Sequence, residues 1–507
     1  MAAESQPNAR MYVAISTAMI GAIMFGIDCG NFGSVQGFGS FRDTWCLRSY
    51  GDATSCGDDA THGAASNARW LKDFVTPASS LLFAGAAAGS LLLGPPLAHR
   101  FGRRPCISAG AAVCLLGCLL TSYITLRSDV VFFAGRFVTG FGIGVCTFAL
   151  PLYNSEVSAP AVRGATGSMF QVNVVLGQLV ASVVTYFNND WRVGMLLPGI
   201  AGVAVALGVW LAPESPRYVM AKRGLEEGTL VLARVRAGSV GAEAAEVMEQ
   251  LESEGSAGQV RWLDLVVGSE GHPSLRRRVL IACWLQFAQQ FTGMNMVIMF
   301  SADVFKLMGF ENPFGANIAF TALQVVGIVV GLALLDSQWG GRRIQLALVT
   351  ATICPLLVLV GLSSQLGWST RLELALLCLF AFVWQLAWGM IPWVYPSELF
   401  TMAERGRATS LAVFVQYAAN AVLTVVVPEL LDALGFAGTV WFFAAFNALN
   451  LVVIAACIKE TKGVPLEEVP RLFAASGVGA KPARDNESEL ELCSATPLAN
   501  EGLRHHR

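Results

Sequence analysis

Long apolar runs constrain the fold of this chain more than any other feature of its sequence. A helix needs about 20 consecutive apolar residues to cross the hydrocarbon core of a lipid bilayer. The sequence contains twelve such runs, at 12–33, 77–98, 105–125, 129–152, 165–187, 194–212, 278–306, 315–335, 343–363, 370–394, 407–431 and 437–457. This pattern predicts an all-α membrane protein with twelve transmembrane helices.

The composition agrees with burial in lipid and argues against several classes of function. Only 14% of the residues are charged, whereas a soluble protein carries about 25%. The net charge of −2 indicates no basic surface for nucleic acid. The sequence contains no P-loop, catalytic triad or metal-ligand cluster, so we expect neither an enzyme nor an ATP-driven pump, and no cofactor. The first residues lack the pattern of a cleaved signal peptide.

Polar segments between the runs predict five parts of the chain. These are a cytoplasmic N-terminus (1–11), a six-helix half (12–212), a cytoplasmic linker with short helices (213–277), a second six-helix half (278–457) and a largely disordered cytoplasmic tail (458–507).

Basic residues in short loops predict the orientation, because such loops stay on the cytoplasmic side of a membrane. They cluster at 100–104, 163, 342–343, 405–407 and 459–462. With twelve spans all these loops lie on one side. We therefore expect a plasma-membrane protein with both termini in the cytoplasm and with the loop around Asp58 outside.

Three short motifs recur in the same order in both halves. Gly-Arg-Arg at 102–104 recurs at 341–343, the segment 155–164 recurs at 397–406, and Pro-Glu-Ser at 213–215 matches Lys-Glu-Thr at 459–461. The offsets are 239, 242 and 246 residues. Motifs repeated at nearly one spacing predict two pseudo-symmetric halves, related by an axis along the membrane normal, which rock around a central site.

These motifs resemble those of the sugar porter family of the major facilitator superfamily. The segments that carry the resemblance are GRR at 102–104, PLYNSEVSAPAVRG at 151–164, PESPR at 213–217, QQFTGMN at 289–295, WVYPSELF at 393–400 and ETKG at 460–463. The resemblance covers residues 12–470. It implies a carrier of a monosaccharide, a hexose such as glucose, that works by alternating access. Polyols and related compounds are alternative substrates.

The chain departs from the family's motifs near the predicted cytoplasmic gate. His99 and Gln338 stand where the family usually has an aspartate before Gly-Arg-Arg. Lys459 replaces a proline, and Met390 follows Gly389 where a proline is common. These departures concern the gate and not the fold.

Charged residues at the cytoplasmic helix ends are predicted to form a latch. Arginine–carboxylate pairs are strong in a partly dry site, so such a network would hold that side closed and break when the halves rock. The predicted members are Arg103, Arg104, Glu156, Arg163, Glu214, Arg342, Arg343, Glu398, Arg405 and Glu460. The alternative is a set of solvated pairs worth about 0–1 kcal/mol each.

Uncharged amides inside the apolar runs indicate a site for a polar, neutral substrate. A carboxamide both donates and accepts hydrogen bonds, and in apolar surroundings it must find a partner. Three of them lie about 17–26 Å along the seventh helix from Arg278, near the bilayer midplane. By resemblance, the sugar-contacting positions are Gln171, Gln289, Gln290, Asn295, Trp393 and Gln416. Asn420 on the eleventh helix is a further candidate.

Other features of the spans have a structural interpretation. Buried amides also hold helices together, and Gln178 and Gln286 are interpreted as packing residues. The asparagine that the family carries on the eighth helix is missing, because the count puts Val326 there. The tenth helix is expected to be broken between Pro392 and Pro396, on either side of the candidate tryptophan.

Asp28 and Arg136 are ionisable residues inside predicted spans. They lie about 7 Å and about 10 Å below the outer boundary by helical rise, so the two side chains can meet. Burying a charge in a membrane is expensive, which makes the pair a functional hypothesis. Protonation of Asp28 would free Arg136 and couple the entry of a proton, the expected coupling ion, to sugar binding. The alternative is a permanent structural ion pair.

Two of the twelve cysteines, Cys46 and Cys56, share a polar loop on the predicted outside. A disulfide between them would close a short loop over the entrance, in an oxidising compartment. The alternative is two free thiols, or pairing elsewhere. The other cysteines lie in apolar runs or, for Cys493, in the tail.

The leading functional hypothesis is proton-coupled uptake of a hexose. A facilitative uniporter would carry the same sugars without a proton. A sugar sensor would use the same fold to signal through its tail. The expected partners are a small-molecule sugar and the lipid bilayer.

Overall fold

A computed structural model describes residues 6–47, 70–256, 260–268, 274–335, 337, 340–464 and 468–474. Within these ranges nearly the whole chain is helical. One two-stranded antiparallel sheet pairs β1 (Gln6–Pro7) with β2 (Arg236–Ala237). The predicted all-α fold is therefore confirmed.

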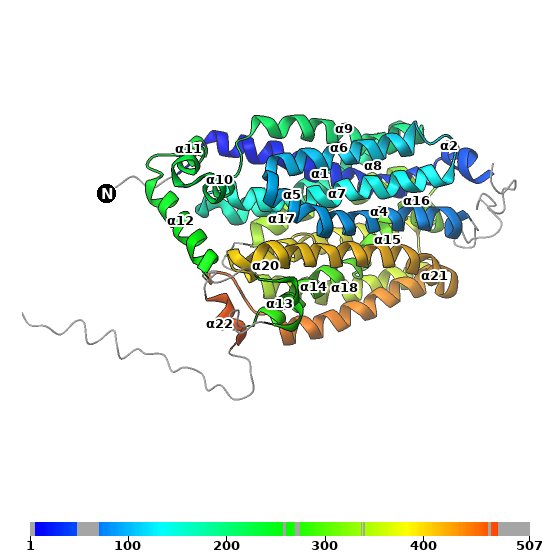
Figure 1. The fold of residues 1–507 in the computed structure, drawn as a ribbon. Coiled ribbons are helices and arrows are strands. Elements are labelled where there is room, and N and C mark those ends of the chain that lie inside the picture. The colour runs from blue at the N-terminus through cyan, green and yellow to red at the C-terminus, as the bar shows by residue number, and fades with distance from the viewer. Residues whose placement is uncertain are drawn as a thin grey trace, which may run out of the picture.

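The first half consists of six long helical segments, α1 to α9 (Figure 1). Asn8 begins the first of them, because its side chain accepts a hydrogen bond from the backbone N–H of Met11. The second segment is a chain of helical pieces that includes two π-helical turns. The bounds are α1 (Ala9–Val35), η3 (Leu71–Val75), α4 (Thr76–Ala88), η4 (Gly89–Leu93), α5 (Gly94–Phe101), α6 (Arg103–Ser122), α7 (Asp129–Val157), α8 (Arg163–Phe187) and α9 (Trp191–Gly208).

The second half, α14 to α21, follows four short helices of the linker. Four short elements of the first half complete its list. They are α2 (Gly39–Arg42) and the π-helix η1 (Asp43–Leu47) after α1, η5 (Pro160–Val162) between α7 and α8, and η6 (Val209–Leu211) after α9. The remaining bounds are α10 (Pro216–Arg223), α11 (Leu225–Val235), α12 (Gly241–Ser256), α13 (Trp262–Val267), α14 (Leu275–Gln290), α15 (Met294–Met299), α16 (Ser301–Leu307), α17 (Pro313–Leu335), α18 (Arg342–Gln365), α19 (Thr370–Gln385), α20 (Ile391–Leu399), α21 (Met402–Cys457) and α22 (Val469–Ala474).

The chain makes twelve membrane crossings, some as single long helices and others as several shorter pieces. Among the described residues, 9 helices are long and apolar enough to cross a membrane unaided. One of these, Glu404–Cys457, contains two crossings that meet at Gly435, where the backbone turns with φ 67°. The seventh and tenth crossings are assembled from shorter pieces, α14–α16 and α19–α20. The predicted spans lie within a few residues of these twelve segments.

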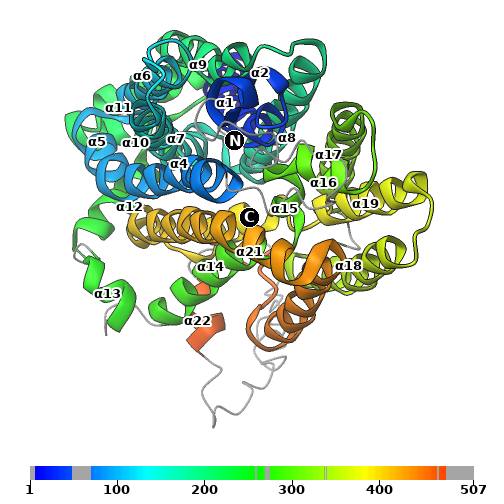
Figure 2. The same cartoon turned by 90° about the vertical axis from the view of Figure 1, so that its right-hand side faces the viewer.

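The two halves lie side by side, and both described chain ends are at one end of the bundle (Figure 1). We call that end, which carries α10–α12 and α22, the terminal face, and the opposite end, which carries α2, the distal face. Figure 2 shows α4 beside α21 along the seam between the halves, and α8 packs against α17. The two halves therefore meet along these two helix pairs.

The predicted internal repeat appears as repeated contacts at the terminal face. Each half ties the start of its third helix to its fourth helix with an arginine–glutamate pair, and each uses a tyrosine and a second arginine to bond backbone carbonyls. The matching pairs are Arg103–Glu156 (2.6 Å) with Arg342–Glu398 (2.7 Å), Tyr153–Pro213 O (2.8 Å) with Tyr395–Lys459 O (2.7 Å), and Arg104–Trp210 O (2.8 Å) with Arg343–Ala455 O (2.8 Å). The two halves therefore share a fold as well as motifs.

The seventh and tenth crossings are interrupted near the centre of the bundle. Gly293 lies between α14 and α15 with φ 98°, a conformation that glycine adopts without strain. In the tenth crossing the break precedes Pro392 instead of lying between Pro392 and Pro396, so the predicted position is wrong. Pro392 occupies the first turn of α20, where a missing backbone N–H costs nothing because that position has no helical acceptor.

A buried ion pair fixes the start of the second half. Arg278 donates to both carboxylate oxygens of Glu404, at 2.7 and 2.9 Å, and also to the carbonyl of Leu399 at 2.7 Å. The two side chains are 0% and 1% exposed. Both charges are compensated, so the pair clamps α14 to α21 next to the end of α20.

The first half receives the corresponding arginine from the linker. Arg236, which follows α11, donates to the carbonyl of Val157 at 2.9 Å and pairs with Glu243 at 2.8 Å. Val157 precedes Leu399 by 242 residues, the offset of the repeated motif around it. The side chain of Asn8 donates to the carbonyls of Arg234 and Arg236, which joins the linker to the start of α1.

The chain after the twelfth crossing is ordered as far as Ala474. In α22, Val469 and Phe473 are buried, so the disordered tail predicted from Pro470 begins with a packed helix. Lys459, which replaces the proline of the family's motif, donates from its ammonium group to the carbonyl of Leu472 at 2.8 Å. A proline cannot make that bond. Residues 475–507 lie outside the described residues.

Glu404→Gln is expected to destabilise the protein strongly, because it leaves Arg278 charged and unpaired in a dry site. The expected loss is about 3–5 kcal/mol, measured by thermal unfolding of the purified chain in detergent. Glu429→Gln, on the same helix but 61% exposed, is the matched control, with an expected loss of about 0–1 kcal/mol. Equal losses in the two variants would contradict a structural role for the buried pair.

Candidate functional site

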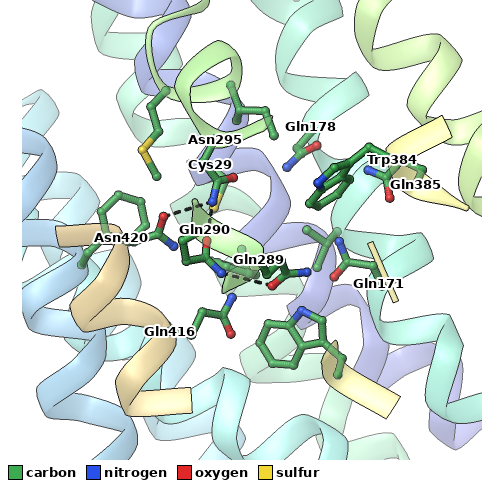
Figure 3. A pocket seen from close by; sticks show the side chains of 16 residues that line it. Cys29, Gln171, Gln178, Gln289, Gln290, Asn295, Trp384, Gln385, Gln416 and Asn420 are labelled. Atoms are coloured by element: carbon green, nitrogen blue, oxygen red, sulfur yellow. Dashed lines mark hydrogen bonds between the residues drawn. The ribbon is translucent and has the colours of Figure 1, made fainter. Parts of the chain in front are cut away.

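A cavity lies between the two halves near the middle of the bundle (Figure 3). Its empty volume, including space that is open to solvent, is about 550 Å³. All seven residues predicted to contact substrate line it, namely Gln171, Gln289, Gln290, Asn295, Trp393, Gln416 and Asn420. The structure thus brings together side chains from α8, α14, α15, α20 and α21.

Amides of the second half form a connected chain along one wall. Gln290 donates to the side-chain oxygen of Gln289 at 3.1 Å, and Gln289 donates to the carbonyl of Trp388 at 2.6 Å. Asn295 donates to Gln290 and, at 3.2 Å, to the side-chain oxygen of Asn420 (Figure 3). The break at Gly293 makes this possible, because side chains both before and after it, from α14 and from α15, reach the cavity.

Three buried amide oxygens near the cavity have no hydrogen-bond partner. They belong to Gln178, Gln385 and Gln416, all of which line the cavity. A buried amide group without a partner is costly, so these oxygens are acceptors that the protein itself does not use.

Several lining residues were not predicted from the sequence. Gln178 was interpreted as a packing residue, and that interpretation is wrong, because it lines the cavity from α8. Trp384 and Gln385 line it from the end of α19, and Cys29 lines it from α1. Gln286 fits its interpretation as a packing residue, since it donates to the carbonyl of Pro392 at 2.9 Å.

The position assigned on the eighth helix was also wrong. Val326 is 53% exposed and faces away from the core. Gln324, two residues earlier, is fully buried and accepts a hydrogen bond from Gln385 at 3.1 Å. An error of two residues rotates a helical position by about 200°, which is enough to change the face it occupies. A glutamine therefore stands behind the cavity wall on this helix.

Contacts between the halves close the bundle on the distal side of the cavity. Lys72 lies 3.1 Å from Glu429 and 3.2 Å from Asp432, at the exposed edge. Deeper in, Arg42 of α2 lies 3.6 Å from Asp303 of α16, with side chains 8% and 10% exposed. We call these two sets of ion pairs the distal contacts.

Other contacts between the halves lie on the terminal side of the cavity. The rings of Phe170 and Trp393 pack at 4.8 Å. The hydroxyl of Ser410 donates to the carbonyl of Ser90 at 2.9 Å. The cavity is therefore bounded by contacts between the halves on both sides.

Asp28 and Arg136 meet inside the first half. A guanidinium nitrogen of Arg136 lies 3.2 Å from one carboxylate oxygen of Asp28, and both side chains are 3% exposed. Arg136 also donates to the carbonyl of Ala78 at 3.1 Å and lies over the ring of Phe32 at 4.4 Å. The second carboxylate oxygen of Asp28 is buried without a partner. Cys29, the next residue, lines the cavity.

The predicted latch residues form pairs within each half. Besides the two arginine–glutamate pairs, Glu214 accepts from the backbone N–H groups of residues 103 and 104, and Glu460 accepts from those of residues 342 and 343. Arg405 donates to the carbonyl of Ser397 at 2.7 Å. The side chain of Arg163 lies outside the described residues, as does Gln338. A latch that opens as the halves rock stays a prediction.

Only one cysteine of the predicted outer loop is among the described residues. Cys46 is disulfide-bonded and buried, whereas Cys56, like Asp58, lies outside the described residues. The nine described cysteines in apolar helices are free, as predicted.

Comparison with known proteins identifies the family. The sequence profile described as "Sugar (and other) transporter" matches residues 13–473. The galactose-proton symporter of Escherichia coli K12 is 27% identical over 405 residues, which are 78% of this chain and 84% of that protein. Sugar carrier protein A of Ricinus communis is 28% identical over 482 residues, 90% of this chain and 88% of that protein.

A sensor and solved transporters are also similar. The high glucose sensor RGT2 of Saccharomyces cerevisiae is 25% identical, and the match covers 93% of this chain and 64% of the sensor. The proton:xylose symporter XylE, bound to 6-bromo-6-deoxy-D-glucose, superposes with a TM-score of 0.76 at 20% identity, over 92% of this chain and 100% of that one. That likeness supports the fold. The chain therefore belongs to the sugar porter family of the major facilitator superfamily and is a multi-pass membrane transporter, not an enzyme.

Proposed function

We propose that this transporter carries a monosaccharide, a hexose such as glucose, by alternating access and in symport with a proton. It works at the plasma membrane, with the terminal face in the cytoplasm. The observation that carries the proposal is the chemistry of the cavity. Eight carboxamides and two tryptophans from both halves line it, and no described lining residue is charged. A neutral, hydroxyl-rich ligand suits such a site.

Each group of the cavity matches a part of a sugar. Carboxamides offer donors and acceptors to vicinal hydroxyls, and three acceptors are unused. The rings of Trp384 and Trp393 offer apolar faces to the C–H side of a pyranose. A charged substrate would find no countercharge among these side chains, and an apolar one would leave the amides unpaired.

Contacts between the halves support alternating access. The distal contacts and the Phe170–Trp393 pair each join the two halves, on opposite sides of the cavity. Because each half is a rigid bundle, rocking can break one set while it preserves the other. The substrate would then reach the cavity from one face at a time.

The unpaired oxygen of Asp28 supports proton coupling. A carboxylate with one free oxygen can accept a proton there without first breaking its bond to Arg136. Protonation removes the charge that holds Arg136. The arginine and α1 can then move, and α1 also lines the cavity, so the change can reach the sugar site. Two similar proteins are named as proton symporters of galactose and xylose.

Gln289→Ala and Asn295→Ala are each expected to weaken sugar binding about 10-fold, because losing one bond and leaving its partner unpaired costs about 1–3 kcal/mol. Binding of labelled glucose to the purified chain measures this. Gln286→Ala is the control, since Gln286 bonds the carbonyl of Pro392 outside the cavity. Equal loss of affinity in the control variant would show that the amides act through folding.

Asp303→Asn is expected to open the distal side, because Asp303 pairs with Arg42 across the halves. Labelling of Cys29 in the cavity by a membrane-impermeant thiol reagent, added from the distal side and mapped by mass spectrometry, should rise by about 10-fold or more, since breaking a buried pair costs about 3–5 kcal/mol.

Lys72→Gln removes the exposed distal pairs and serves as the comparison. Exposed pairs are worth about 1 kcal/mol or less, so labelling of Cys29 should rise at most about fivefold. Unchanged labelling in both variants would mean that the distal contacts do not control access to the cavity.

Asp28→Asn is expected to abolish accumulation of sugar against a gradient and any sugar-induced proton current. Asparagine keeps the shape of the side chain but cannot carry the proton. Exchange of sugar between equal pools should survive, because the cavity amides are untouched. Proteoliposomes with and without a pH gradient provide the measurement. If wild-type uptake ignores both the gradient and a protonophore, the protein is a facilitative uniporter and Asp28–Arg136 is a structural pair.

A further inference from the structure

A second hollow lies on the outside of the seam between the halves. Its empty volume is about 720 Å³, and its lining is entirely apolar. One wall comes from α4 and η4, and the other from α21. The first wall consists of Ala84, Ala87, Ala88, Leu91 and Leu92, and the second of Phe414, Ala418 and Ala421. We call this hollow the seam groove.

The seam groove opens toward the acyl chains of the bilayer and not toward the central cavity. The central cavity uses Phe83 and Gln416 of the same two helices, and these residues lie on other helical faces than Ala84 and Ala418. At the groove, Leu92 is 68% exposed, and Val422, which follows the lining residue Ala421, is 52% exposed. In a protein that spans a membrane, side chains of this kind face lipid.

Positive charge gathers where the groove ends at the terminal face. His99 lies seven residues beyond Leu92, and Arg407 lies seven residues before Phe414. By helical rise, both are about 10 Å from the groove. His99 lies close enough to Arg407 and Lys222 to feel their charges, so the ends of the two walls lie near each other.

The two arginines of this region, Arg407 and Arg100, have no acidic partner in the part of the chain that the structure describes. Arg103 nearby is paired with Glu156, and Glu404 at the start of α21 is occupied by Arg278. Arg407 is half-buried and Arg100 is exposed, and no ion pair of either with a described carboxylate is present. His99 stands where sugar porters usually carry an aspartate, so this chain lacks the negative charge that would offset them.

We propose that the seam groove binds one anionic phospholipid of the bilayer, with an acyl chain between α4 and α21 and the phosphate against Arg407, Arg100 and His99. Charge complementarity selects the headgroup, since basic pockets between transmembrane helices recognise anionic lipids. The groove is long enough to hold part of an acyl chain, because Ala84 to Leu92 spans about 12 Å by helical rise. The walls belong to different halves, so the lipid contacts both moving bodies.

Lipid retention by the full-length chain tests this proposal independently of transport. The protein is purified with equal amounts of phosphatidylglycerol and phosphatidylcholine, and native mass spectrometry counts the lipids it keeps. Phosphatidylglycerol should be retained in preference. Arg407→Gln should reduce that preference about fivefold, the effect of one basic residue at about 1 kcal/mol. Arg223→Gln, an exposed arginine of the same face, is the matched control and should change nothing.

Two further variants test the groove itself. Ala88→Phe and Ala418→Phe fill it from opposite walls, so that a folding defect in one leaves the other informative, and each should abolish the retained phosphatidylglycerol. Retention that survives both fillings would overturn the proposal, as would equal retention by the wild type and Arg407→Gln. Displacement of the bound species by excess inorganic phosphate would also overturn it, because the basic cluster would then bind a free anion without a lipid.

Discussion

Every backbone amide inside a bilayer must find its hydrogen-bond partner within the protein, because no water is available there. Ten of the twelve crossings meet this demand with long helices. The two that do not, α14–α16 and α19–α20, are interrupted beside the central cavity. Irregular backbone is tolerated at that depth only where it borders a cavity or is packed in protein. The interruptions allow Asn295 and Trp393 to face the space between the halves. The site therefore lies at the two places where the helices are interrupted.

Two buried ion pairs show how differently charge can be used at depth. Glu404 has both oxygens bonded, to Arg278 and to the backbone of Thr401, so it offers no place for a proton and holds two helices together. Asp28 has one oxygen bonded and one free. Since the surroundings of both are dry, the difference lies in the count of donors. That count separates a structural pair from one that can change its protonation.

Much of this could be predicted from the sequence, because apolar length, repeated motifs and buried amides are properties of single residues or short segments. The twelve crossings, the meeting of Asp28 with Arg136 and seven of the residues that line the cavity are of this kind. Gln178 shows the limit, because a glutamine in an apolar helix looks the same whether it faces a cavity or a neighbouring helix. The sequence placed Arg278 at the start of the seventh span but did not indicate its partner, since Glu404 lies 126 residues away. The displaced break in the tenth crossing, like the error at Val326, arose because spacing along a chain fixes neither a turn nor a helical face to within one residue.

The two halves repeat one plan, but they are completed by different means. The second half carries its own arginine, Arg278, on the carbonyl of Leu399, whereas the first half receives Arg236 from the linker on the carbonyl of Val157. As a ribosome makes the chain from its N-terminus, the first six crossings emerge before the residue that clamps them. The first half therefore reaches its final packing only after some two dozen further residues have been synthesised and have folded back onto it, about one to five seconds later at usual rates of translation. The linker thus acts as the last piece of the first half before it acts as a bridge to the second.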